Sequence, residues 1–360
     1  MTITRRSAVA ASFAAIGFSR GVAQPVDVLS PFQRSDGKWG FVTAAHCWAA
    51  EPRFEHALQF ADGLAAVRVG DRWGFVDRAG RMAISPHYQA ASTFSEGLAA
   101  VRQNQRWGFV DTAGRIVIQP QFDLRDGTRP DVFIDWSSLP DASGRVRLLP
   151  PLLPGLSFSD GLAALPIGDR WGFIDRTARF AINPQFDDVF PFSDGLAAVR
   201  IGTRWGFIER SGRVAVNPQF ETVYPFADGL AAVRMGDRWG FLDRMGGVSI
   251  APAFDSAGGF SEGLAPVRQG GRWGFIDRHG RMVISAQYED VGRFAEGLAV
   301  FRTNNRWGFI NTAGQVVIPA QFDGSGGSVF SAGHAWVLVG TRAMKISRGG
   351  RILLDPVCSS

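Results

Sequence analysis

The sequence has few cysteines, few lysines and no long apolar run, and each shortage narrows the possible class of protein. Its 360 residues include two cysteines, Cys47 and Cys358, which excludes a disulfide-rich scaffold. Nearly all of the positive charge is arginine, because Lys38 and Lys345 are the only lysines. No stretch after the N-terminal leader approaches the length needed to span a bilayer.

The excess of positive charge lies in that leader. The net charge of +5 falls to +2 without residues 1–23, which contain three arginines and no acidic residue. The mature chain is therefore close to neutral. Its basic character is poor evidence for a nucleic-acid partner, and none is expected.

Residues 1–23 have the segment order of a bacterial export signal. The twin arginines Arg5 and Arg6 precede an apolar, alanine-rich run, and the small residues Gly21, Val22 and Ala23 suit a signal peptidase. The run is too short for an uncleaved transmembrane anchor, and no cysteine follows it for a lipid anchor. We predict cleavage near Ala23 and a periplasmic or secreted mature chain, exported by the twin-arginine route.

Glycine and aromatic residues are abundant, with 44 Gly, 29 Phe and 11 Trp. This combination favours short strands joined by tight turns. The dipeptide Trp-Gly recurs mostly at intervals of 34 residues, with one interval of 64. It occurs at Trp39 and Gly40, Trp73 and Gly74, Trp107 and Gly108, Trp171 and Gly172, Trp205 and Gly206, Trp239 and Gly240, Trp273 and Gly274, and Trp307 and Gly308.

Each 34-residue unit contains three candidate strands, and a degenerate ninth unit closes the chain. These patterns predict an all-β tandem array of about nine three-stranded units. Such units are short for four-stranded propeller blades, and the chain ends show no shift of phase that indicates a shared blade. We therefore expect an open or superhelical solenoid-like array, with a closed propeller-like toroid as the alternative.

The long interval divides the repeats into two groups. We assign residues 24–123 to repeats 1 to 3, and residues 158–360 to repeats 4 to 8 with the degenerate C-terminal unit. Residues 124–157 between them form an insertion or a decayed half-repeat. Long insertions in repeat arrays usually lie on one face and often carry function.

The glycine of the Trp-Gly dipeptide has a structural implication of its own. Along the second strand, Trp107 and Phe109 point to one side and Gly108 to the other. Glycine inside a strand marks a bulge or a close approach by other atoms. We interpret Gly108 as the seat for an aromatic ring from an adjacent strand or unit.

With eight Trp-Gly-Phe motifs in phase, the chain resembles the WG-repeat family of bacterial proteins over roughly residues 29–355, apart from the insertion. The resemblance implies a β-rich tandem array that is often secreted or associated with the cell envelope. It implies no conserved catalytic residues.

Two short strings resemble motifs of chymotrypsin-like serine proteases. Residues 43–47 match the histidine motif, with His46 as the base, and residues 323–327 resemble the nucleophile motif around Ser325. Both fall in turns or connections of the repeat, so an exported serine hydrolase is the least favoured interpretation. The five histidines lack metal-ligand spacing, and the recurring acids suit turn caps. We therefore predict no catalytic residue, cofactor or metal.

Arginines recur at fixed positions of the unit. If consecutive units stack regularly, the arginines that precede four of the tryptophans lie on one line and form a candidate ligand face for an anionic polymer or glycan. They are Arg204, Arg238, Arg272 and Arg306. The competing interpretation is that each arginine pairs with a nearby acidic residue.

These features together favour an exported, non-catalytic repeat scaffold that binds a protein or an envelope polymer. Binding of an anionic polymer or glycan through the arginine and tryptophan columns is the first alternative, and the serine hydrolase is the second. In an open array Cys47 and Cys358 would lie about eight units apart, so we also expect two free thiols.

The export route gives the first test. Replacing both Arg5 and Arg6 by Lys should leave the unprocessed precursor inside the cell, because the twin arginines distinguish this leader from a general secretory signal. Cell fractionation and N-terminal mass spectrometry would detect the precursor. Normal export and cleavage of the double variant would instead indicate the general secretory route.

Overall fold

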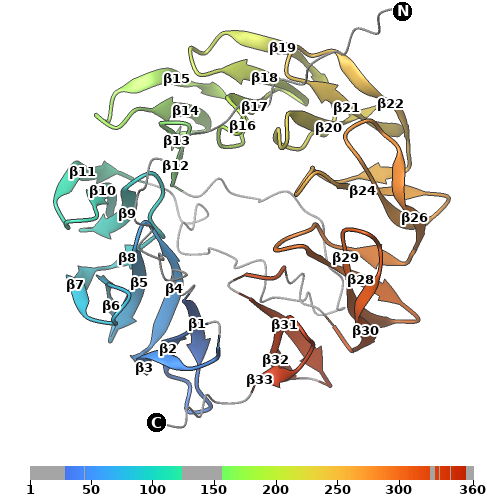
Figure 1. Ribbon diagram of the computed structural model, residues 1–360. Coiled ribbons are helices and arrows are strands. Elements are labelled where there is room, and N and C mark those ends of the chain that lie inside the picture. The colour runs from blue at the N-terminus through green and yellow to red at the C-terminus, as the bar shows by residue number, and fades with distance from the viewer. Residues whose placement is uncertain are drawn as a thin grey trace, which may run out of the picture.

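The computed structural model describes residues 29–43, 45–123, 156–324, 329–331, 333–340 and 342–353. The export signal, most of the insertion, Ser325 and Cys358 lie outside these residues. The described chain is all-β and forms nine small antiparallel sheets arranged in a ring, which is a nine-bladed β-propeller (Figure 1). No helix among the described residues is long and apolar enough to cross a membrane.

The first four blades follow one another along the chain. Blade 1 contains β1 (Ser30–Gln33), β2 (Trp39–Val42) and β3 (Trp48–Phe54). Blade 2 contains β4 (His56–Ala61), β5 (Leu64–Val69), β6 (Arg72–Val76) and β7 (Met82–Tyr88). Blade 3 contains β8 (Ala90–Ala91), β9 (Leu98–Gln103), β10 (Arg106–Asp111) and β11 (Ile116–Phe122). Blade 4 contains β12 (Phe158–Ser159), β13 (Leu162–Ile167), β14 (Arg170–Ile174) and β15 (Phe180–Phe186).

The remaining five blades complete the ring. Blade 5 contains β16 (Asp188–Val189), β17 (Leu196–Ile201), β18 (Arg204–Glu209) and β19 (Val214–Phe220). Blade 6 contains β20 (Leu230–Met235), β21 (Arg238–Asp243) and β22 (Val248–Phe254). Blade 7 contains β23 (Ser256–Ala257), β24 (Ala265–Gln269), β25 (Arg272–Ile276) and β26 (Met282–Tyr288). Blade 8 contains β27 (Asp290–Val291), β28 (Leu298–Thr303), β29 (Arg306–Asn311) and β30 (Val316–Phe322). Blade 9 contains β31 (His334–Val339), β32 (Arg342–Ser347) and β33 (Ile352–Leu353).

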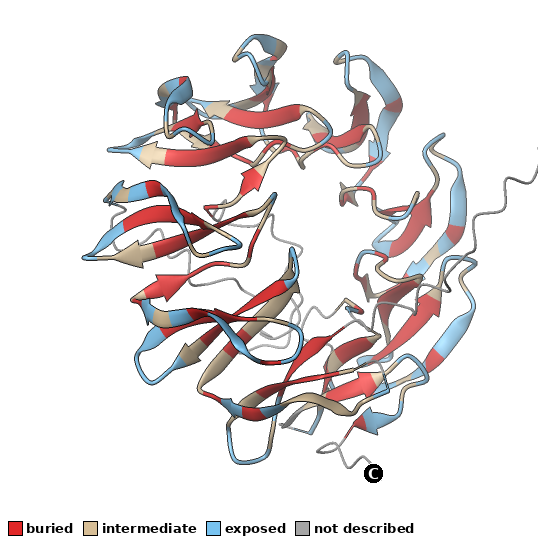
Figure 2. Ribbon diagram, turned by 60° about the vertical axis from the view of Figure 1, so that its left-hand side comes forward, coloured by how far each residue is buried: buried red, intermediate tan, exposed pale blue. Residues whose placement is uncertain are grey.

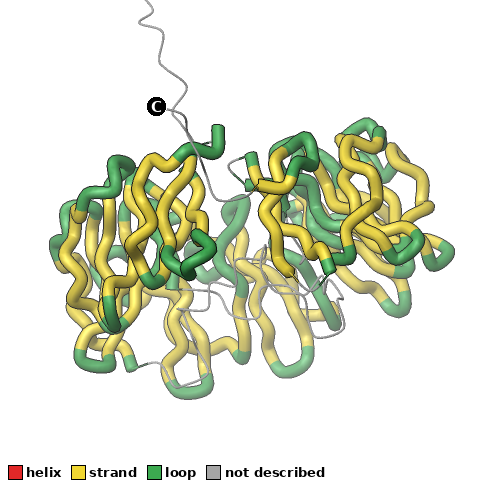
Figure 3. The backbone as a smooth tube through the Cα atoms, turned by 90° about the horizontal axis from the view of Figure 1, so that it is seen from below, coloured by secondary structure: helices red, strands yellow, loops and turns green. Residues whose placement is uncertain are grey.

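Each blade runs from the centre of the ring outwards, and its antiparallel strands place successive connections on opposite faces (Figures 1 and 3). The tight hairpin before each Arg-Trp-Gly and the connector to the next blade share one face, which we call the hairpin face. The Phe-Ser-Glu-Gly loops and the turns before the outer strands share the other, which we call the glycine face. We call the interface between two consecutive blades a seam.

The core consists of layers between blades, because each blade is too thin to bury its own apolar residues (Figure 2). The phenylalanine of Trp-Gly-Phe packs against the phenylalanine of the next unit's Phe-Ser-Glu-Gly loop, as in the pair Phe207 and Phe226 at 4.8 Å between ring centroids. Seven further seams repeat this contact at 4.7–5.1 Å. Edge-to-face and tilted geometries of this kind are favourable for aromatic pairs.

The expected open or superhelical array is wrong, and the closed toroid is the observed form. The expected three strands per unit are found in three described sheets, and six sheets have a fourth strand. The count of nine units and the 34-residue spacing are confirmed. The missed fourth strand is the innermost one, which in most four-stranded blades is two residues long, as in β16. Such a short strand carries no alternating pattern, so it left no signal in the sequence.

The ring closes between blades 9 and 1 through a polar seam. Lys345 stands at the register position of the buried phenylalanine, and His334 at that of a buried leucine. The Lys345 ammonium donates to Ser30 Oγ at 3.0 Å and to the Pro31 carbonyl at 2.9 Å, and His334 Nδ1 lies 3.2 Å from Ser30 Oγ. Lys345, His334 and Ser30 are all buried. Closure is therefore specified by polar contacts as well as by apolar packing of Phe32 beside them.

The expectation of two free thiols is also wrong, because Cys47 is disulfide-bonded. The chain contains one other cysteine, Cys358, which lies outside the described residues. The expectation depended on the distance between the first and last units of an open array. Closure removes that distance, since blade 1 lies beside blade 9 (Figure 1).

Glycine is required in the Trp-Gly dipeptide because backbone atoms of the outer strand lie too close for a Cβ atom. A Cβ built on Gly108 would lie 2.4 Å from the Ile118 carbonyl oxygen and 2.7 Å from the Pro120 nitrogen. Both atoms belong to the outer strand of the same blade, where the pairing register shifts at a bulge. The predicted aromatic ring from an adjacent strand or unit is therefore wrong for Gly108, and backbone at a bulge of the same sheet takes its place.

We expect Gly206→Ala to lower the free energy of unfolding by about 1–3 kcal/mol, because the added methyl group would meet backbone that cannot rotate away. Its Cβ would lie 2.5 Å from the Val216 carbonyl oxygen. Gly259→Ala is the matched control, since no atom lies within 4 Å of its Cβ position. Urea melts compare the two variants. Equal stabilities would show that the close approach does not constrain the fold.

Candidate functional site

The four candidate ligand-face arginines lie on the hairpin face, each at the start of the Trp-Gly-Phe strand of its blade, and they are about half-exposed. Each forms an ion pair with the acidic residue 17 positions later, in the connector to the next blade. The pairs are Arg204 with Glu221 at 3.5 Å, Arg238 with Asp255, Arg272 with Glu289 at 3.9 Å, and Arg306 with Asp323. The competing interpretation, in which each arginine pairs with a nearby acidic residue, predicted contacts of this kind.

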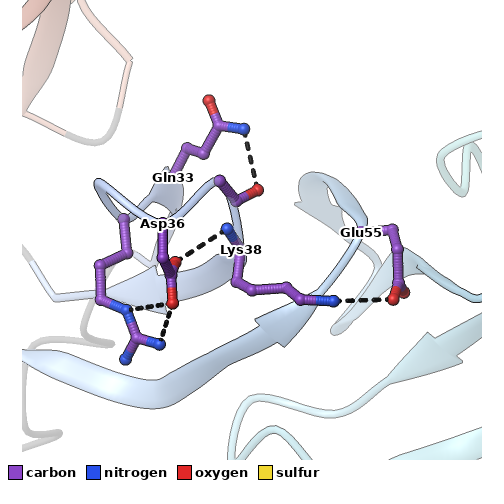
Figure 4. A network of polar contacts seen from close by, with 6 residues as sticks. Gln33, Asp36, Lys38 and Glu55 are labelled. Atoms are coloured by element: carbon purple, nitrogen blue, oxygen red, sulfur yellow. Dashed lines mark hydrogen bonds and ion pairs between the residues drawn. The ribbon is translucent and has the colours of Figure 1, made fainter.

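The connector acid also accepts a backbone hydrogen bond from the hairpin of the following blade. Asp187 accepts from the Gly202 N–H at 2.6 Å, and Asp323 accepts from the Gly340 N–H at 2.7 Å. At the first seam Glu55 accepts a hydrogen bond from the Gly70 N–H. It also pairs with Lys38, which replaces the arginine (Figure 4). The connector thus ties each blade to the next. Each exposed ion pair contributes about 0–1 kcal/mol to stability.

A second column of arginines occupies the next-to-last position of the strand before most hairpins. Arg234 lies 3.8 Å from Glu221, and Arg302 lies 3.4 Å from Glu289, so a connector acid can contact arginines from both of its blades. Arg302 also lies over the Trp307 ring at 5.6 Å. Inside blade 8, burial raises the pKa of the Asp290 carboxyl, and the charges of Arg302 and Arg268 oppose the shift without cancelling it.

The acids of the Phe-Ser-Glu-Gly loops bond to the next blade instead of capping their own turn, which corrects their expected role, whereas turn aspartates such as Asp111 cap their turns as expected. Each loop carboxylate accepts the N–H of the corresponding glycine one blade later, as Asp194 does from Gly229 at 2.8 Å. Each of these loop acids has a positive φ of 50–53°. The other bonds run from Gly97 to Asp62, Gly161 to Glu96, Gly195 to Asp160, Gly263 to Asp228, Gly297 to Glu262, and Gly333 to Glu296.

The tryptophans of the repeat pack inside the seams. Trp73, Trp107, Trp273 and Trp307 are buried, and the other four are partly buried. Trp205, for example, lies 5.1 Å from the Phe190 ring at its seam. The tryptophan column is therefore part of the core layers and not an open stacking surface.

His46 occupies the turn position that glycine fills in most other blades. Its φ is 61°, and its N–H donates to the Thr43 carbonyl at 2.9 Å, as Gly80 donates to Asp77 in the next blade. Ser325, its proposed partner in the hydrolase interpretation, lies outside the described residues. No group of three His, Cys, Asp or Glu side chains that could hold a metal occurs in the described part of the chain.

Sequence reasoning missed the Ser30, His334 and Lys345 cluster at the closing seam. A serine beside a histidine is the arrangement of a nucleophile and its base. Here the exposed fractions are 1% for Ser30, 3% for His334 and 5% for Lys345, which leaves no access for a substrate. The cluster therefore acts in ring closure. Its sequence signal was a lysine in place of the phenylalanine of the repeat.

Turn aspartates on the glycine face have lowered pKa values. The backbone N–H of Arg115 holds the pKa of the Asp111 carboxyl below its ordinary 3.8, and the Arg281 N–H does the same for Asp277. Blade 8 has Asn311 at this position, and it accepts the same two backbone bonds. The turn therefore forms without a charged side chain at this position. Where the residue is aspartate, the stability of the fold depends on pH.

A lowered pKa in the folded state stabilises the fold above the ordinary pKa, and this stabilisation is lost as the pH falls through the folded value. We expect urea stability to decline below about pH 4. Replacing both Asp111 and Asp277 by Asn should make that decline shallower, because the turns persist while two titrating groups disappear. Melts from about pH 6 to about pH 3 measure the slope. An unchanged slope in the double variant would contradict this account.

Comparison with solved structures supports the fold alone. A eukaryotic initiation factor is similar with a TM-score of 0.59 and 11% identity, over 91% of this chain and 95% of that chain. The dihydro-heme d1 dehydrogenase NirN in complex with DHE has a TM-score of 0.44 and 12% identity, over 86% of this chain and 76% of that one. Apo AztD from Citrobacter koseri has a TM-score of 0.39 and 10% identity, over 80% and 92%. No curated protein matches the sequence.

The repeat itself matches a known family. The model of the WG containing repeat matches residues 39–73, 73–107, 107–124, 171–202, 205–239, 239–273, 273–307 and 307–340. These matches cover more than half of the chain, and each of them starts at the tryptophan of a Trp-Gly dipeptide. The protein belongs to the WG-repeat family.

Proposed function

We propose that the protein is an exported, non-catalytic binding scaffold whose hairpin face docks a protein or polymer of the periplasm or cell envelope. Corresponding positions of the nine blades can be compared with one another. Positions that packing requires keep the same residue, and other positions vary. Variation between blades concentrates at the hairpins. This one-sided variation is the observation that carries the proposal.

The hairpin tips differ in charge, size and polarity. They are Gly70 and Asp71, Asn104 and Gln105, Gly168 and Asp169, Gly202 and Thr203, Gly236 and Asp237, Gly270 and Gly271, and Asn304 and Asn305. The residue before each tip varies too, and apolar examples are exposed by 47% at Ile167 and 48% at Ile201. A surface of varied polar residues with scattered exposed apolar ones is typical of a recognition surface.

The glycine face, by contrast, keeps the acid and the glycine of its loops in nearly every unit, and these two residues bond blade to blade. Most of its outer turns also end in glycine, although the full pattern Asp-Arg-x-Gly occurs in three units. Residues held to one identity by packing and hydrogen bonding cannot be tuned to a partner. We therefore place docking on the hairpin face.

Binding of an anionic polymer along the four arginines is the second candidate. Side-chain exposure of 48% for Arg204, 53% for Arg238, 51% for Arg272 and 50% for Arg306 favours it. Five N–H donors on each guanidinium leave some free for a ligand after the ion pair forms. The acids beside them weaken this candidate, because a polyanion would have to compete with each carboxylate.

The test compares variants of the two faces in binding to a purified envelope fraction. Ile167→Ser with Ile201→Ser removes apolar contacts from adjacent hairpins, and we expect binding to fall at least about tenfold, since burying one such side chain contributes about 1.5–3 kcal/mol. Met245→Ser is the control, because Met245 is 89% exposed on a turn of the glycine face. Co-sedimentation measures the bound fraction. An equal loss in both variants, or none in either, would refute docking through the hairpin face.

A further inference from the structure

At two seams the acidic residue of the connector contacts two arginines, one from each of the two blades that it joins. At the seam between blades 5 and 6, Glu221 lies 3.5 Å from Arg204 of blade 5 and 3.8 Å from Arg234 of blade 6. At the seam between blades 7 and 8, Glu289 lies 3.9 Å from Arg272 and 3.4 Å from Arg302. One carboxylate therefore serves guanidinium groups from both sides of the seam.

The seam between blades 2 and 3 keeps the two arginines and lacks the carboxylate. The corresponding residues are Arg72 of blade 2 and Arg102 of blade 3, and the connector residue is Gln89. Gln89 Oε1 still accepts the hairpin N–H of Gln105 at 2.8 Å, so the structural link is intact. The other connector positions carry acids, at Glu55, Asp123, Asp187, Glu221, Asp255, Glu289 and Asp323.

No other carboxylate compensates these arginines fully. Arg72 lies 3.7 Å from Asp71, whose side chain is 87% exposed and so screened by water. Arg102 donates to the neutral Gln105 side chain, and its buried Nε has no hydrogen-bond acceptor. Among the described residues, Arg102 has no acidic partner within ion-pair distance.

Two further arginines extend the positive charge along the same face. Arg68 lies in β5, which pairs with the strand of Arg72. Burial lowers the pKa of His56, and the charge of Arg68 lowers it further. Arg106 begins the third strand of blade 3 and is exposed. Within the part of the chain that the structure describes, neither Arg68 nor Arg106 lies in an ion pair.

We propose that the hairpin face binds an external phosphate group at this seam, through the guanidinium groups of Arg72 and Arg102. The phosphate takes the electrostatic role that Glu221 and Glu289 have at their seams. The proposal rests on the hairpin face as the docking face and names the chemistry of one group that the partner presents there.

A phosphate suits the site better than a single carboxylate. Arg72 and Arg102 have one exposed aspartate, Asp71, beside them, which leaves an excess of positive charge for an external anion to neutralise. The three acceptor oxygens of a phosphate ester can serve both guanidinium groups at once. Guanidinium groups bind phosphate oxygens in a bidentate manner, and such charge-assisted bonds are roughly twice as strong as neutral ones. The phosphate can be free or carried as an ester on a larger molecule.

Calorimetric titration of the purified mature chain with inorganic phosphate at low ionic strength tests the site. We expect one phosphate per chain, and loss of binding in Arg72→Gln with Arg102→Gln. Gln89→Glu should lower the affinity at least about tenfold, because the chain then supplies its own carboxylate. Arg204→Gln with Arg234→Gln is the matched control at an acid-filled seam and should bind phosphate normally.

Two additional arms sharpen the result. Glu221→Gln should create a second phosphate site, because it copies the arrangement of Gln89 at another seam. Tighter binding of glucose 1-phosphate than of inorganic phosphate would indicate a phosphate ester as the natural group, and the reverse order would indicate free phosphate. Thermal melts verify that each variant is folded.

The proposal is overturned if the wild-type chain binds no phosphate, or if Gln89→Glu binds it as tightly as the wild type. The titration contains only the protein and a phosphate compound. Its failure therefore removes this site and leaves docking through the hairpin face to the separate envelope experiment. If the titration succeeds and the envelope experiment fails, the phosphate site stands and docking of an envelope partner is refuted.

Discussion

The contact between the Trp-Gly-Phe phenylalanine of one unit and the loop phenylalanine of the next is the interaction on which the ring depends. Phe207 and Phe226 show it, and both are almost fully buried. A blade has no core of its own, so any open end of the array would expose a complete apolar layer. Closing the ring covers both terminal layers at once. The closed form is thus the expected outcome once the rotation per blade allows the ends to meet.

A ring of similar blades must also specify which ends meet. At eight seams the layer is apolar, and any of these faces would fit several partners. Lys345 and His334 change this, because their buried polar atoms form hydrogen-bond contacts with Ser30 and the Pro31 carbonyl across the closing seam. Placed against an ordinary blade, the ammonium would face phenylalanine without hydrogen bonds, at a cost of several kcal/mol. The polar seam therefore selects one closure and disfavours addition of a second chain.

Local features of the fold were predictable from the sequence, and features that depend on the whole ring were not. The period of Trp39 to Trp307 predicted all-β units of 34 residues because each unit carries its own turns and strands. Closure is a sum of small rotations over nine blades, and no single residue encodes it. Lys345 and His334 resembled decay of the repeat, although they form a specific seam. The acids such as Asp194 were assigned to turns, since a bond to the next blade cannot be distinguished from a cap in one unit.

In the arginine columns, the contacts that repeat from blade to blade belong to packing, and one seam departs from them. The ion pairs of Arg204, Arg238, Arg272 and Arg306 are explained by the connectors they hold, so their regularity reflects construction of the ring. Gln89 departs from that regularity in one property alone. Glutamine has the shape of glutamate, and the bond to the hairpin of the next blade is kept at 2.8 Å. Packing therefore does not account for the exchange. What is lost is a negative charge between two arginines, and a charge supplied by a bound phosphate restores the balance found at the other seams.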